Sequence, residues 1–210
     1  CWKTYVGRPE TDWARGYAME ELANGLSDAD HHEDALSVQE AELSMLRRRG
    51  APEVSILNTQ NNLANTYMFL YRREEAMSLQ RDVYSGRLKL NGEEHRDTFN
   101  AASNYATSLR VLKRFEEAKL LLRKTLPVAR GVLGEGNQTT LRLRWSYAQS
   151  LYEDPGATFD DVREAVTTIE DAERIARRVF GGSNPVTTAV EKTLRGARAA
   201  LRALETPSGS

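Results

Sequence analysis

An internal repeat of 42 residues constrains the fold of this chain more than any other sequence feature. The segment NNLANTYMFLYRREEAMSLQ (residues 61–80) is echoed by SNYATSLRVLKRFEEAKLLL (residues 103–122). Asn62, Ala64 and Ala76 therefore recur 42 positions later, as asparagine, alanine and alanine. A repeat of this length is typical of a solenoid or a propeller, and the secondary structure of the unit decides between them.

Glycines mark the repeats along the chain. Gly50, Gly92 and Gly134 lie 42 residues apart, and Gly181 follows after 47 because the segment EDPGATFDD carries five extra residues. The sequence thus predicts four repeats with one insertion. The expected organisation is a lead-in at 1–11, repeats at 12–49, 50–91, 92–133 and 134–181, an inserted loop at 153–161, a capping helix at 182–204 and a tail at 205–210.

Each repeat is predicted to be a pair of helices. Leu63, Tyr67 and Leu70 recur at helical spacing, and the second half of each repeat shows the same period. Pro127 is expected to bend or shorten its helix. Small residues recur mid-way along the first helix and near the start of the second, where two helices can cross closely only if one side chain is small. These residues are Ala35, Ala64, Ala76, Ala106, Ala118, Ala148 and Ala165.

The boundaries between repeats carry helix-end signals. The repeat glycines suit the left-handed backbone that often follows a helix. His95, Asn137 and Asn184 occupy equivalent positions just before the next helix, where capping side chains are expected. Thr158 and Asp161 form a T-x-x-D pattern that indicates a capping box after the insertion.

These features together resemble the tetratricopeptide repeat (TPR), in its 42-residue kinesin-light-chain-like variety. The resemblance is carried by the small-residue positions, the NLA…Y…EEA run and the linkers NGEEHRDT, LGEGNQTT and FGGSNPVT, and it covers about residues 12–187. It implies an all-α fold: a right-handed TPR superhelix, or α-solenoid, of about four helical hairpins plus a C-terminal capping helix. In such a superhelix the first helices line a concave groove that binds peptides.

The groove residues follow from which face of each first helix lacks a neighbour. That face holds amides, arginines and aromatic side chains in repeats two to four. The predicted set is Asn58, Asn61, Asn62, Asn65, Phe69, Asn100, Ser103, Asn104, Thr107, Arg110, Arg142, Trp145, Gln149 and Tyr152.

The chemistry of this set fits an extended peptide, with a structural alternative for several members. An amide both donates and accepts, which matches a peptide backbone, and the resemblance places Asn62 and Asn104 at main-chain-binding positions. Bonding within the helix stack is an equally weighted alternative for those two. Arginine pairs strongly with carboxylates, so Arg110 is expected to bind ligand. Trp145 is expected to pack, beneath the inserted loop.

Charge is distributed unevenly. Residues 1–46 carry 3 basic and 10 acidic side chains, residues 47–151 carry 18 and 10, and the whole chain has a net charge of −1. The basic middle favours an acidic partner and would speed their encounter. The acidic start and basic middle also permit salt-sensitive self-association, head to tail.

Several classes of function lack support in the sequence. The near-zero net charge does not favour nucleic acid, and no apolar run is long enough for membrane insertion. Adjacent His31 and His32 point about 100° apart on a helix and make a poor metal site. No catalytic motif is present, so neither an enzyme nor a cofactor or metal is expected. An intracellular, cytoplasmic location is expected; organelle targeting stays open because the chain does not begin with Met and resembles a truncated protein.

The sequence therefore predicts a protein–protein interaction module. Its ligand would be an extended acidic peptide segment with an aromatic or apolar anchor, bound in the concave groove. The alternative is a structural spacer or assembly subunit that contacts partners through the convex face or the solenoid ends.

Overall fold

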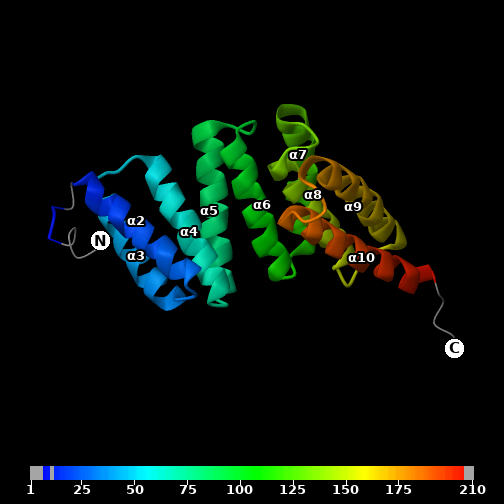
Figure 1. Cartoon of the computed structure of the whole chain (residues 1–210), viewed down its shortest axis with the longest axis horizontal. Coiled ribbons are helices and arrows are strands. Elements are labelled where there is room, and N and C mark those ends of the chain that lie inside the picture. The colour runs from blue at the N-terminus through cyan, green and yellow to red at the C-terminus, as the bar shows by residue number, and fades with distance from the viewer. Residues whose placement is uncertain (1–6, 10–11, 206–210) are drawn as a thin grey trace. The chain divides into compact units, whose positions relative to one another are not determined.

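The computed structural model describes residues 7–9 and 12–205, and these form helices without strands (Figure 1). The chain divides into two compact units, residues 1–89 and 90–210. The helices in order are α2 (Trp13–Asp28), α3 (His32–Arg48), α4 (Glu53–Phe69), α5 (Arg73–Asn91), α6 (Arg96–Val111), α7 (Phe115–Leu133), α8 (Gln138–Tyr152), α9 (Phe159–Phe180) and α10 (Pro185–Glu205). The predicted all-α fold of helical hairpins with a C-terminal helix is confirmed.

The first unit is built around α2, α3, α4 and α5. Helix α3 packs against both α2 and α4. Its apolar cluster includes Leu36 and Leu43 of α3, Leu63 and Tyr67 of α4, and Ala76 of α5. The helical spacing of these residues places them on the inward faces of their helices. Burial of these apolar faces, rather than helix propensity alone, therefore holds the hairpins together.

The second unit stacks α6, α7, α8, α9 and α10. Each of these helices packs against the next, and α8 also packs against α6 and α10. The core includes Phe99, Leu122, Leu141 and Ile169, all 0 % exposed. Because α10 covers the apolar sides of α8 and α9, it closes the core at the C-terminal end of this unit, as expected of a capping helix.

The expected helix-end signals take the predicted conformations. Gly50, Gly92, Gly134 and Gly181 all have positive φ, between 63° and 83°, a region that favours glycine. The Nδ1 atom of His95 accepts a hydrogen bond from the Asp97 amide, and the Oδ1 atoms of Asn137 and Asn184 accept from Thr139 and Val186. The linker sequences are therefore stop-and-start signals between helices.

The tight turns inside the first three hairpins show a feature that was not predicted. Asp30, Tyr71 and Lys113 have φ of 61°, 60° and 61°, at equivalent positions of their repeats. A left-handed backbone costs a residue with a side chain about 1–2 kcal/mol relative to a right-handed one. The turn geometry thus imposes the same strained residue three times, whatever side chain stands there.

Close helix crossings explain the recurring alanines. The seven predicted alanines are all 0 % exposed. Gly86 of α5 shows the same requirement, since a Cβ atom there would lie 2.6 Å from Cδ2 of Leu57 on α4. Helix α7 continues through Pro127 to Leu133, so the proline does not shorten it, and a bend stays a prediction.

The inserted loop is shorter than the predicted 153–161. Helix α9 begins at Phe159 because Thr158 and Asp161 form the expected capping box: Thr158 Oγ1 accepts from the Asp161 amide at 3.1 Å, and the Asp161 carboxylate accepts from the Thr158 amide at 2.9 Å. Residues 159–161 are therefore the first turn of α9.

Removing this cap should destabilise the second unit. We expect Thr158→Ala to lower the free energy of unfolding by about 1 kcal/mol, because the first turn of α9 loses a hydrogen-bond acceptor. Urea unfolding followed by circular dichroism measures the change. Thr167→Ala, an exposed position inside the same helix, is the matched control and should be neutral or slightly stabilising; an equal loss in both variants would contradict the capping role.

Candidate functional site

The candidate site in the second unit lies on α6 and α8, whose predicted residues come into contact. Thr139 Oγ1 donates to Asn100 Oδ1 at 3.0 Å. Arg142 Nη2 donates to Asn104 Oδ1 at 3.1 Å. Side chains three or four residues apart share one helix face, so these bonds form a row along the α6–α8 contact. Asn104 thus takes part in bonding between helices, the structural alternative open for it.

The charged end of this row centres on Glu153. Arg110 Nη1 donates to Glu153 Oε2 at 2.5 Å, Gln149 Nε2 donates to Oε1 at 3.2 Å, and the Tyr152 hydroxyl donates to Oε1 at 3.4 Å. Burial, and next the negative charge of Glu153, raise the pKa of Tyr152 to about 12, which keeps its hydroxyl a proton donor. Arg110, Gln149 and Tyr152 together form a site that accommodates one carboxylate; we call these three residues the carboxylate cradle.

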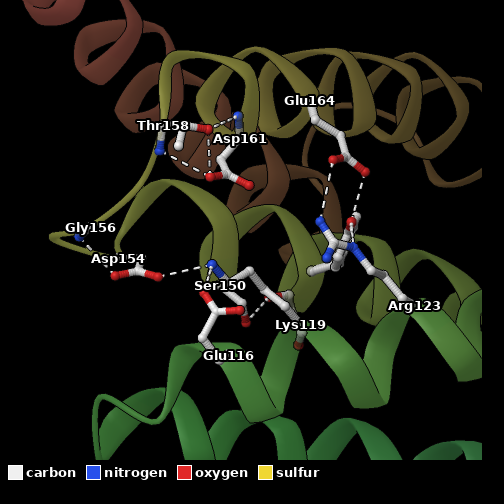
Figure 2. A network of polar contacts seen from close by, with 11 residues as sticks. Glu116, Lys119, Arg123, Ser150, Asp154, Gly156, Thr158, Asp161 and Glu164 are labelled. Carbon is white, nitrogen blue, oxygen red and sulfur yellow. Dashed lines mark hydrogen bonds and ion pairs between the residues drawn. The ribbon is translucent and has the colours of Figure 1, made fainter.

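The loop after Glu153 is anchored by a polar network (Figure 2). Lys119 of α7, with a side chain 5 % exposed, donates to Asp154 Oδ2 at 2.9 Å and pairs with Glu116. Asp154 Oδ1 accepts from the Gly156 amide at 2.9 Å. Burial opposes the charge of Lys119, but its two acidic partners outweigh that effect and raise its pKa. The ion pair between Lys119 and Asp154 therefore fixes the start of the loop.

Sequence reasoning missed this network, although a signal was present. Lys119 occupies the repeat position that Met77 holds in the preceding repeat, and Leu36 in the one before. A cation at a position otherwise apolar needs a buried partner. Glu153 and Asp154, the acidic residues where the insertion begins, were candidates for that partner.

The remaining predicted residues of the second unit differ in burial. Ser103 is 2 % exposed, and Thr107 Oγ1 donates to its carbonyl at 2.9 Å. Burial lowers the pKa of the partly exposed Arg142. Trp145 packs against the core, and its Nε1 donates to Thr193 Oγ1 of α10 at 2.7 Å. Its polar partner is therefore the capping helix. The expected place of Trp145 beneath the inserted loop stays a prediction.

The predicted residues of α4 lie in the first unit, and two of them bond to the other helix of their own hairpin. Asn58 Oδ1 accepts from Arg87, and Asn65 Oδ1 accepts from Gln80 Nε2 at 3.4 Å. Both partners are on α5 and both are buried. These asparagines therefore join the helices of the hairpin.

The other α4 residues differ in exposure. Phe69 is 61 % exposed, and its ring stacks on His32 with a centroid distance of 4.5 Å. Asn61 and Asn62 are partly exposed. Asn62 remains a predicted ligand contact, with the structural alternative beside it.

The described part of the chain contains no group of three or more His, Cys, Asp or Glu side chains arranged to hold a metal ion. Within the same residues, none of the helices combines the length and apolar character needed to cross a membrane.

Comparisons with known proteins agree with this architecture. Residues 56–97 match the family described as tetratricopeptide repeat. A solved structure of the nearly identical TPR-like repeats of a putative kinesin light chain from Podosopora anserina is 21% identical, with a TM-score of 0.74 over 95% of this chain and 91% of that one. A variant of the same protein gives a TM-score of 0.76 at 21% identity, over 91% and 88% of the two chains. BtubC (BKLC) from P. vanneervenii is 17% identical, with a TM-score of 0.68 over 94% and 83%. No curated protein matches the chain.

Proposed function

We propose that this chain, which is built from tetratricopeptide repeats of the kinesin-light-chain-like type, is a protein–protein interaction module that binds an acidic peptide segment on the α6–α8 face. One observation carries the acidic preference: the carboxylate cradle already holds a carboxylate, that of Glu153. Charge-assisted bonds from arginine to carboxylate are about twice as strong as neutral ones.

Neighbouring groups support an extended ligand. Asn100, Asn104 and Arg142 are all partly exposed and line the same pair of helices as Arg110. Amide and guanidinium groups supply the hydrogen bonds that a peptide backbone and acidic side chains need. Tyr152, also partly exposed, adds an aromatic surface at one end, of the kind enriched at binding hot spots.

A direct test compares three fluorescein-labelled ten-residue peptides by fluorescence anisotropy. Each has one central tryptophan, flanked by glutamate and aspartate, by lysine, or by serine and glutamine. We expect the acidic peptide to bind about tenfold more tightly than either other peptide, with the preference weakening as salt rises. Equal affinity for all three would overturn the proposal.

A charge-matched pair of variants locates the binding surface. Arg142→Gln should weaken binding of the acidic peptide about tenfold, because it removes a cation from the α6–α8 face. Arg163→Gln removes the same charge from an exposed side chain of α9 and should leave affinity unchanged. Arginine is replaced by glutamine rather than glutamate, because a new carboxylate in place of Arg110 or Arg142 would also repel Glu153. Circular dichroism confirms that both variants keep their helices.

A further inference from the structure

Glu153 stands at a position where the two preceding repeats have no acid. The residues 42 and 84 positions earlier are Val111 and Phe69, both apolar. The fold therefore does not require a carboxylate here. Glu153 lies immediately before the residues that are inserted in the fourth repeat.

The backbone of Glu153 is held in place, whereas its side chain is partly exposed to solvent where it contacts the carboxylate cradle. Its amide donates to the Gln149 carbonyl at 3.0 Å, which ends α8. The next residue, Asp154, is pinned by Lys119 (Figure 2). The Glu153 side chain keeps 29% of its surface exposed, so it can rotate into solvent without moving the loop.

The pairing leaves part of the cradle unused. Arg110 reaches Glu153 through Nη1, while its buried Nε has no hydrogen-bond partner. A guanidinium binds a carboxylate best through two parallel N–H bonds. Glu153 is attached at the end of α8 and bonds to Arg110 through Nη1 while Nε stays unpaired. A carboxylate on a separate chain is not restricted in this way. The Arg110–Glu153 pair is accordingly an exchangeable contact.

We propose that Glu153 occupies the site at which a carboxylate of the acidic ligand binds, and that the ligand must displace it. This inference rests on the proposed function and adds to it a competitor within the chain. An internal competitor lowers apparent affinity by the fraction of molecules in which the site is open. Glu153 thereby sets how tightly acidic partners bind.

The test measures the acidic peptide described above against Glu153→Gln and Glu153→Ala. Both should bind it about tenfold more tightly than the wild type, since neither offers a competing charge to Arg110. Two variants are used because glutamine can still accept a hydrogen bond from Arg110, whereas alanine cannot.

A matched control separates local competition from net charge. Glu164→Gln on α9 removes one negative charge at a side chain that accepts from Tyr147 at 2.7 Å and does not contact the cradle. Its affinity should equal that of the wild type. Adding Arg110→Gln to Glu153→Gln should abolish the gain, because the competing and the incoming carboxylate use the same arginine.

The outcomes distinguish this inference from the proposed function. If the wild type prefers the acidic peptide but both Glu153 variants bind it no more tightly, the inference that Glu153 competes with the ligand is overturned and the proposed function stands. If neither the wild type nor the variants prefer the acidic peptide, both are overturned. A gain in affinity in Glu164→Gln equal to that in Glu153→Gln would also overturn this inference, since the gain would then reflect net charge alone.

Discussion

Phe99→Ala should lower the free energy of unfolding by about 3–5 kcal/mol, because it removes a buried ring and leaves a cavity. Phe99 is 0 % exposed in the first turn of α6 and belongs to the core of the second unit. Leu57 and Leu141, which lie 42 residues before and after it, are 2 % and 0 % exposed. The position is therefore a core position in three successive repeats.

Two variants sharpen this experiment, in which urea unfolding is followed by circular dichroism. Phe99→Leu inserts the residue that the neighbouring repeats use and should cost less than about 1.5 kcal/mol. Leu120→Ala on α7, at a side chain 72 % exposed, should change stability by no more than about 0.5 kcal/mol. A loss below about 1 kcal/mol for Phe99→Ala would contradict the core assignment.

Glu42 should make the first unit less stable as pH rises from about 4.5 to 7. Burial, and next the charge of Glu20, raise its pKa from 4.5 to about 7, although a hydrogen bond from Thr59 and the charge of Arg49 act in the opposite direction. Below pH 4.5 the carboxyl is protonated in both states. Between the two values only the unfolded chain ionises, so stability falls, and above about 7 the loss is complete.

At about 1.4 kcal/mol for each pH unit between those values, the loss is on the order of 3 kcal/mol. Glu42→Gln should remove it, because an amide does not titrate. The measurement is urea unfolding at a series of pH values from about 4 to 8. Glu33→Gln, an exposed glutamate of the same helix, should keep the wild-type profile. A wild-type profile that coincides with that of Glu42→Gln would show that Glu42 ionises equally in both states.

The features that recur along the chain could be predicted from sequence, because each repeat meets the same physical constraint. Gly92 and Gly134 end equivalent helices, and Ala64 and Ala106 sit at equivalent crossings. The capping box at Thr158 was also predictable, since it depends on residues only three apart.

The candidate site was less predictable, because side-chain partners are set by packing rather than by spacing. The pair Arg110–Glu153 joins residues 43 apart in neighbouring repeats, and Glu153 lies next to the insertion. Asn58 was assigned to the groove from its helix face, but Arg87 of α5 offered it a buried donor. A helical face fixes where a Cβ atom lies, whereas an amide can turn toward whichever neighbour supplies a partner.

The closing helix α10 also affects how copies of this chain could associate. Its solvent side carries four exposed basic residues: Lys192, Arg195, Arg198 and Arg202. Two such ends brought together would repel each other. Symmetric tail-to-tail pairing is thereby disfavoured. A filament of copies would have to be polar, with each basic end meeting an acidic surface such as the exposed carboxylates of α2 and α3.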